Sequence, residues 1–206
     1  MPRKLDPAVA AALTDAVREC EACSRAEIVV EIRARSGSYA HADARFASVV
    51  AFATLLLLLF SPWTFHTQWV AIDVVLAWIL GLFLSRKSDA VRRVMTTARE
   101  RDAQARLVAG SVFHERGIAN TAEETGVLAY LSLLEGRIEL LADRAVLESV
   151  PTLEWNRIAA FARGRHATTA TLLELVRELR PLLERHLPSR EGDIDELCNV
   201  PRFVTD

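Results

Sequence analysis

Two apolar stretches, FASVVAFATLLLLLF at residues 46–60 and WVAIDVVLAWILGLFL at residues 69–84, decide how this chain is organised. They contain no Lys, Arg or Glu, and Asp73 is the single acid between their ends. Ser61 and Pro62 interrupt the apolar text, which predicts two hydrophobic helices joined by a short loop. We expect each arm to hold roughly 16–18 residues, or about 24–27 Å of helix, slightly less than a hydrocarbon core of about 30 Å.

We predict that this hairpin spans a membrane, because two consecutive uncharged stretches would be difficult to cover within so small a domain. A buried soluble hairpin and a re-entrant hairpin are the alternatives. Trp63, Phe65 and Trp69 are typical of the aromatic belt at a membrane interface. Asp73 follows Trp69 by about one helical turn. We therefore expect Asp73 to reach water at that interface rather than to act as a functional acid inside the membrane.

The positions of Lys and Arg predict which side of the membrane faces the cytoplasm. The loop at 61–67 contains none, whereas Arg33, Arg35 and Arg45 precede the hairpin and residues 86–93 contain four. We therefore expect a two-pass protein of the bacterial inner membrane, with both termini and the polar domain in the cytoplasm and the loop outside. The N-terminal residues lack the apolar core of a signal peptide, so we expect none.

Outward from the hairpin, the sequence predicts helices and strands on both sides. Before it, residues 6–23 have helical spacing behind an Asp-Pro start, and residues 26–34 alternate as a strand with one polar side. After it, residues 88–117 predict one long, highly charged helix. Residues 126–134 are almost continuously apolar, as in a buried central strand, and residues 137–143 alternate as its hairpin partner.

The last third of the chain returns to helical spacing. Residues 151–163 and 168–186 predict two amphipathic helices, and Pro181 should kink the second one or split it in two. The acidic tail at 188–206 has few residues that could pack in a core, so we expect it to be extended or disordered.

A single strand cannot form a sheet, so the parts of the chain on either side of the hairpin must pack together. We therefore predict one α/β domain formed by residues 1–45 and 88–187. In this arrangement residues 46–87 are a transmembrane insertion into the domain rather than a linker between two domains, and residues 188–206 form a separate tail.

Composition excludes some function classes. The formal net charge is -2 and no basic stripe carries interleaved aromatic residues, so we expect no nucleic-acid partner. Three cysteines give no disulfide framework. Cys20 and Cys23 form a C-x-x-C pair that could be redox-active or half of a zinc site, but helical spacing puts Cys20 on an apolar face. A packed, reduced Cys20 is therefore the interpretation we favour.

Four carboxylates are the candidate metal ligands. Glu27 and Glu31 share one face of the first predicted strand, and Glu139 and Asp143 share a face of the third. If those strands are neighbours, the oxygens could gather around Mg²⁺ or Ca²⁺, with Asp143 the strongest candidate because it ends a strand. The alternative is that these acids form exposed ion pairs with arginines of the same strands. No nucleophile or phosphate-loop motif is present, so whether the protein is an enzyme stays open.

Two segments, SRAEIVVEIRARSGSY (24–39) and GIANTAEETGVLAYLSLLEGRIELLADRAV (117–146), resemble the TPM domain family. The resemblance rests on an acid-containing opening strand, a Gly-Val-Leu strand at 126–128 and a strand ending in Asp-Arg at 143–144. Ala145 stands where the family has Gly. A subset of the family carries two membrane segments inside the domain, as this chain is predicted to do.

The resemblance implies an αβα sandwich with a small mixed sheet, interrupted here by the transmembrane hairpin. Members of the family are linked to acid phosphatase activity, to divalent metal binding and to the maintenance or assembly of membrane protein complexes. We therefore expect a membrane-anchored TPM-like module that supports or binds a membrane protein complex, a role that requires no catalysis. Its partners would be the lipid bilayer and a membrane protein or a second copy of the chain. The alternative is a membrane-anchored phosphatase dependent on a divalent metal.

Overall fold

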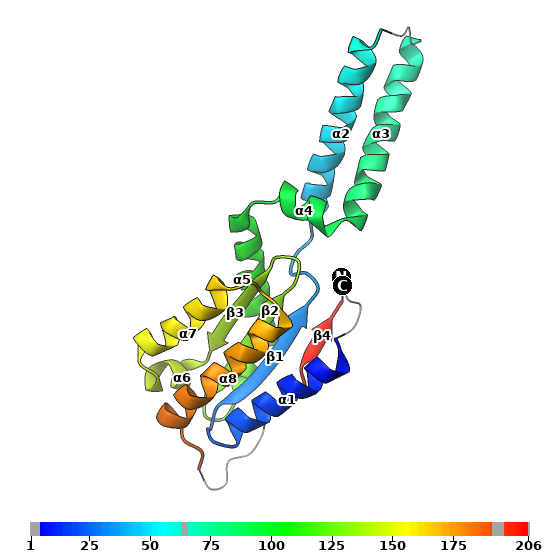
Figure 1. Ribbon diagram of the computed structural model, residues 1–206. Coiled ribbons are helices and arrows are strands. Elements are labelled where there is room, and N and C mark those ends of the chain that lie inside the picture. Colours follow the sequence, from blue (N-terminus) through cyan, green and yellow to red (C-terminus); the bar gives the residue numbers. More distant parts are fainter. Residues whose placement is uncertain (1–4, 63–65, 191–195, 206) are drawn as a thin grey trace. The chain divides into compact units, whose positions relative to one another are not determined.

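The computed structural model describes residues 5–62, 66–190 and 196–205 (Figure 1). The chain divides into two compact units. One consists of residues 1–36 and 102–206, and the other of residues 37–101. The insertion therefore begins and ends in polar sequence, outside the apolar stretches themselves.

The first unit is built on a four-stranded sheet in the order β3-β2-β1-β4. Its strands are β1 (Glu27–Arg33), β2 (Gly126–Ser132), β3 (Arg137–Ala142) and β4 (Arg202–Val204). β1 runs parallel to β2 and β4, and β2 runs antiparallel to β3. The predicted mixed α/β class with a small mixed sheet is confirmed.

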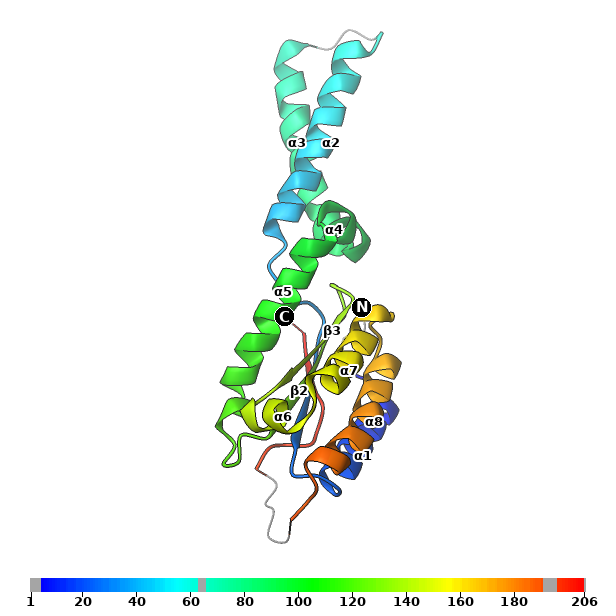
Figure 2. The ribbon, with the colours of Figure 1, turned by 90° about the vertical axis from the view of Figure 1, so that its left-hand side faces the viewer.

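Helices cover both faces of this sheet (Figure 2). On one face, Ile28 and Val127 pack in a core with α1 (Pro7–Glu21), α7 (Thr152–Gly164) and α8 (Thr169–His186). The short helix α6 (Arg144–Ser149) adds Val146 to the same core.

The other face of the sheet carries a smaller core. Leu128 and Tyr130 of β2 pack there against α5 (Ala98–Glu115) and against Ile118 in the 3₁₀ turn η1 (Ile118–Asn120). Successive strand residues point to opposite faces, so alternate residues of the same strands supply the two cores.

The predicted long helix after the hairpin is wrong, because it is broken into α4 (Asp89–Met95) and α5. Thr97 causes the second helix to start afresh. Its hydroxyl accepts a hydrogen bond from the Glu100 N–H (3.2 Å), and the Glu100 carboxylate accepts one from the Thr97 N–H (2.8 Å). This reciprocal capping box satisfies backbone donors that an uninterrupted helix would not leave open.

One expectation near the C-terminus also changes, and the extended tail acquires a defined partner. α8 is a single helix through Pro181, so the predicted split does not occur. Pro181 lies on the exposed side, while Leu179 and Leu182 on either side of it are buried and hold the helix on the core. Within the tail, residues 202–204 are extended as β4, and the Ala34 N–H donates to the Val204 carbonyl at 3.0 Å.

The second unit is a helical hairpin of α2 (Ala40–Phe60) and α3 (Thr67–Lys87), followed by α4. Each long helix has 21 residues, which is about 32 Å at 1.5 Å per residue. The predicted length of 16–18 residues is therefore wrong, because the polar lead-in at 40–45 is also helical. Both helices are long and apolar enough to cross a membrane. Trp63 and Phe65 of the predicted outer loop lie outside the described residues.

The hairpin packs through small residues and exposes its large ones. Gly81 lies so close to α2 that a Cβ atom there would be 2.8 Å from the Ala47 Cα. Only 17% of the most apolar window of α2 and 11% of that of α3 is buried. A core hairpin of a soluble protein would be mostly buried. This hairpin is mostly exposed, and because its large side chains are apolar, its outward surface is apolar too. Its exposed side chains include Phe52, Leu57, Phe60, Trp69, Val75, Ile79 and Phe83.

Candidate functional site

The predicted carboxylates lie on one face of the sheet, in two rows across the strands. In the first row, Glu31 and Glu139 are both register partners of Tyr130. β1 and β3 are therefore not neighbours, since β2 and the ring of Tyr130 lie between the two acids. This is the face that α5 covers.

Glu31 is completely buried and is held by two arginines. Its Oε1 accepts a hydrogen bond from Arg33 Nε at 2.6 Å, and its Oε2 accepts one from Arg116 Nε at 3.1 Å. Arg33 follows on the same strand, whereas Arg116 comes directly after α5. Both carboxylate oxygens therefore face cations of the protein, which is an arrangement that repels a metal ion.

Glu139 is also engaged by α5. Arg106 Nε lies 3.5 Å from Glu139 Oε1, and Arg137 at the start of β3 bonds the carboxylate of Asp102. The Arg106 side chain is 60% exposed, so its pair with Glu139 adds less than about 1 kcal/mol to stability. These contacts hold α5 to the edge of the sheet.

The second row contains Glu27 and Asp143 on either side of Gly126. Glu27 pairs in register with Gly126, and the Asp143 N–H donates to the Gly126 carbonyl at 2.8 Å. Ile118 of η1 covers this glycine, because a Cβ there would be 2.2 Å from the Ile118 carbonyl oxygen. Leu197 of the tail donates its N–H to Glu27 Oε2 at 3.2 Å. Protein backbone therefore covers Gly126 and contacts the Glu27 carboxylate.

Asp143 caps α6. Its Oδ1 accepts a hydrogen bond from the Arg144 N–H at 2.7 Å, and its carbonyl accepts one from the Leu147 N–H at 3.2 Å. Its Oδ2 is buried and has no hydrogen-bond partner in the described part of the chain. The local geometry thus gives Asp143 a clear structural role at the end of β3.

Within residues 5–62, 66–190 and 196–205, no three His, Cys, Asp or Glu side chains come together as a group that could hold a metal ion. Glu31 and Glu139 face arginines, Glu27 meets a backbone amide, and Asp143 caps a helix. Mg²⁺ and Ca²⁺ require six or more oxygen ligands converging on one point. The four carboxylates are spread over two rows and do not fit such a centre.

A buried hydroxyl chain lies at the other end of the same face. The Tyr130 hydroxyl is 2.6 Å from Ser36 Oγ, which donates to Ser132 Oγ at 2.6 Å. Ser132 bonds the Glu135 carboxylate, which also accepts the Ser36 N–H at 2.9 Å. Burial raises the pKa of Tyr130 from 10.0 to about 12, so its hydroxyl keeps its proton even at an alkaline pH where an exposed tyrosine would ionise. These hydrogen bonds hold Ser36 in place, and Ser36 is the last residue of the first unit before the insertion.

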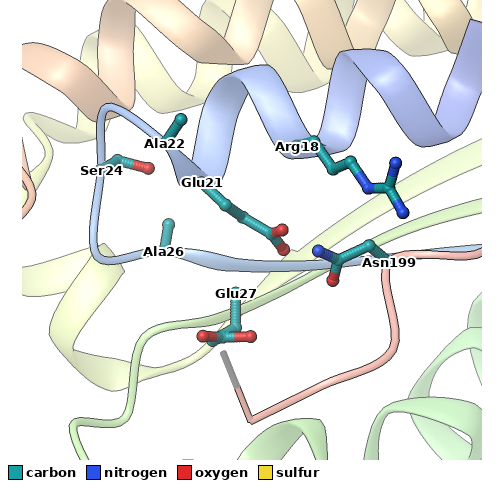
Figure 3. A pocket seen from close by; sticks show the side chains of 7 residues that line it. All are labelled: Arg18, Glu21, Ala22, Ser24, Ala26, Glu27 and Asn199. Atoms are coloured by element: carbon teal, nitrogen blue, oxygen red, sulfur yellow. The ribbon is translucent and has the colours of Figure 1, made fainter. Parts of the chain in front are cut away.

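A polar cavity of about 320 Å³ lies beside the free half of the β1 edge (Figure 3). β4 pairs only with residues 31–33 of β1. Nearer the start of β1, the Ile28 N–H donates to Glu21 Oε1 at 3.0 Å instead of to the backbone of a neighbouring strand. Arg18, Glu21 and Asn199 line the cavity, and Figure 3 shows the Glu21 carboxylate pointing toward the Asn199 amide. Glu27 also lines it, on the opposite side of β1.

The C-x-x-C pair lies at the end of α1. Cys20 is completely buried, its thiol donates to the Val176 carbonyl at 3.3 Å, and burial raises its pKa to about 12. Cys23 is partly exposed and bonds backbone carbonyls of its own helix. The predicted packing of Cys20 in the core is confirmed, and a thiol with so high a pKa is a poor nucleophile.

The foot of the hairpin contains a buried ion pair. Asp43 of α2 and Arg92 of α4 are 4% and 8% exposed. Arg92 donates from Nε to Asp43 Oδ1 at 3.0 Å and from Nη2 to Oδ2 at 2.9 Å. Ser85 of α3 donates its hydroxyl to Asp43 Oδ1 at 2.7 Å. Three helices of the second unit therefore meet at one carboxylate.

The chain is similar in fold to the BA42 protein of the psychrophilic bacterium Bizionia argentinensis, whose structure was determined by NMR. The two chains superpose with a TM-score of 0.57 over 99% of this chain and 98% of that one, at 16% sequence identity. Identity this low shows a shared fold alone. No family model matches the sequence, and no curated protein matches it.

Sequence patterns placed Glu27, Glu31 and Glu139 on the correct strands, and Asp143 directly after β3, but missed what surrounds these acids. Arg106 and Arg116 lie in the segment predicted to be a long, highly charged helix, and only the docking of α5 reveals their partners. Asp43 and Arg92 are separated by the whole hairpin. The signal that could have found this pair is that each is a charge beside an apolar segment long enough to cross a membrane.

Proposed function

We propose that the chain is a two-pass, membrane-anchored module with a TPM-like fold that binds or supports a membrane protein complex without catalysis. The observation that carries this proposal is the outward apolar surface of α2 and α3. An exposed apolar surface that extends along two adjacent 21-residue helices needs lipid or another apolar partner to cover it.

The charges around the hairpin support an orientation with the polar domain in the cytoplasm of a bacterial cell. At its foot, Arg86, Lys87 and Arg93 are exposed. The loop at 61–67 contains no Lys or Arg. Trp69, at the start of α3, is 60% exposed and suits the outer interface. This is the distribution expected when the loop crosses the inner membrane and the basic residues at the other end of the hairpin remain in the cytoplasm.

The contacts of the sheet carboxylates support a role that requires no catalysis. A metal-dependent phosphatase needs acids that are free to bind a cation and orient water. Here Glu31 is paired with two arginines and Asp143 caps a helix. The same contacts are well suited to a rigid binding module, since they fix α5 and the loops to the sheet.

A membrane protein, or a second copy of this chain, is the partner that the hairpin suits. In lipid, helices associate mainly through close packing and polar contacts, because the tails are as apolar as the side chains. Within the hairpin, Ala47 and Gly81 are already used for the contact between α2 and α3. The exposed aromatic side chains Phe52 and Trp78 are left for lipid or for a neighbouring helix.

The test uses the full chain purified from membranes in mild detergent after brief crosslinking. We expect a stoichiometric membrane protein or a second copy to co-purify, and Phe52→Ala together with Trp78→Ala to reduce it, with Leu153→Ala as the exposed control outside the hairpin. The same preparation is assayed on a chromogenic phosphate ester with Mg²⁺ or Ca²⁺. Cation-dependent hydrolysis that disappears in Asp143→Asn would contradict the proposal and establish the phosphatase alternative.

A further inference from the structure

A solvent-open hollow in the first unit is lined by cationic side chains. It has a volume of about 570 Å³ and lies where α7 ends and α8 begins, beside the start of β3. We call it the arginine hollow. It is lined by Arg137, Arg163, Gly164, Arg165, His166 and Thr171. Such a volume is within the range of small-molecule sites, which is about 300–1,000 Å³.

The charges of the hollow are of one sign. Three guanidinium groups and one imidazole line it, and none of its lining residues is an acid. A smaller cavity of about 160 Å³ shares Arg137 and Arg163 with it and is also lined by Arg106 and by two acids, Asp102 and Glu139, which pair with Arg137 and Arg106. Like charges gathered around a concave surface raise the local potential and attract anions.

Two of the three arginines are held by contacts outside the hollow. Arg165 lies 2.5 Å from Glu174 and stacks on the ring of Phe161, with 4.2 Å between its Cζ and the ring centroid. Arg137 bonds Asp102 through Nε. Because these side chains are already ordered, a ligand would not have to order them.

Arg163 differs from both. Its Nε donates to the Ala159 carbonyl of its own helix at 3.2 Å, which orients the guanidinium. Among the described residues no carboxylate lies within ion-pair distance of it, and its Nη groups make no hydrogen bond there. The Nη groups of Arg137 are likewise without a partner in the described chain. Arg137 and Arg163, which both line the hollow, therefore each have Nη–H groups available to donate hydrogen bonds to a ligand.

We propose that the arginine hollow binds a phosphate-bearing anion. Planar guanidinium groups donate pairs of parallel hydrogen bonds to phosphate oxygens, and several of them suit a doubly charged group better than a single carboxylate. The first turn of α8, which contributes Thr171, adds the partial positive charge of an 18-residue helix. This inference does not depend on the proposed function, since it uses residues of the first unit alone.

The phosphate could belong to a soluble molecule or to a lipid headgroup, and two titrations separate these sources. The full chain in detergent is titrated calorimetrically with inorganic pyrophosphate, and separately with dihexanoyl phosphatidic acid below its critical micelle concentration. Ionic strength is held constant, because guanidinium–anion contacts at a surface are screened by salt. We expect saturable one-to-one binding in at least one titration. Pyrophosphate alone would indicate a soluble ligand, and phosphatidic acid alone a headgroup.

Variants decide whether the hollow is the site. Arg163→Gln should weaken binding about tenfold, since it removes charge-assisted hydrogen bonds, and Arg163→Lys should retain part of the affinity. Arg157→Gln is the matched control, because Arg157 is an exposed arginine of the same helix that does not line the hollow. Arg163 is exposed, so its variants should unfold at the temperature of the parent protein. No saturable binding of either probe, or binding that Arg163→Gln leaves unchanged, would overturn the proposal.

Discussion

Arg116 reaches the buried carboxylate of Glu31 from 85 positions further along the chain, with 3.1 Å between Nε and Oε2. Arg33 completes the pairing from the other side at 2.6 Å. The two guanidinium groups supply the positive charge that a metal ion would supply in an acidic cation site. This contact connects the end of α5 to the sheet and decides how the acids of β1 are used.

Glu31→Gln should lower the free energy of unfolding by about 2 kcal/mol, because it leaves two partly buried guanidinium groups without their counter-charge. Glu148→Gln, which removes an exposed pair with Arg144, should have no measurable effect. Denaturant unfolding of both variants tests this. Mg²⁺ or Ca²⁺ should not raise the unfolding temperature of the parent protein. A rise that Glu31→Gln abolishes would show a metal site that the pairing argument excludes.

Arg92→Ala should destabilise the hairpin by about 3 kcal/mol, because it strands the buried carboxylate of Asp43. Heat-induced aggregation of the protein in detergent measures the loss. Arg99→Ala is the control, since Arg99 is exposed in the same unit. If Asp43→Asn combined with Arg92→Ala is no more stable than Arg92→Ala alone, the stranded charge is not the cause of the loss.

Two glycine substitutions should have opposite signs. Gly126→Ala should destabilise by about 3 kcal/mol or more, since the added methyl group would meet the backbone of Ile118 at 2.2 Å. Gly110→Ala should stabilise by about 0.5–1 kcal/mol, because it lies inside α5 with nothing within 4 Å of the new methyl group. Chemical denaturation of the two variants beside the parent tests the packing of η1 over the sheet.

Stability should fall above pH 9 in part through Cys20. Burial raises the pKa of this thiol from 9.0 to about 12, so in that interval the unfolded chain loses a proton that the folded chain retains. The contribution of Cys20 is therefore complete below pH 9 and is lost as the pH rises toward 12. Cys20→Ala should flatten the decline of unfolding free energy between pH 9 and 10. An unchanged slope would mean that the thiol is accessible in the folded protein.

Local patterns were sufficient to predict the strands that bury apolar residues on both faces. The near-continuous apolar run from Gly126 and the alternation from Arg137 each specify a strand without help from other residues. β4 has three residues and only two large apolar side chains, Phe203 and Val204, so its partner β1 rather than its own sequence determines it. A pattern of this length is indistinguishable from an extended tail.

The polar contacts could not be predicted, because they depend on how distant segments dock. Glu31 lies on the side of its strand that was predicted to be polar, yet it has no exposed surface, since α5 covers that side. The arginine hollow likewise combines Arg137 of β3 with residues 163–166, at the end of α7 and just after it. Each of these segments reads in isolation as an ordinary charged surface.

The orientation of the hairpin is tested most directly by labelling single cysteines in intact cells. Cys198 is exposed in the first unit, and Ser61 lies at the end of α2 in the loop predicted to be outside. In a background with Cys23→Ser, a thiol reagent that cannot cross membranes should leave Cys198 unlabelled until the cells are permeabilised. Ser61→Cys, with Cys198→Ser, should be labelled in intact cells. Labelling of Cys198 in intact cells, or equal protection of both positions there, would contradict a two-pass anchor that holds the α/β unit in the cytoplasm.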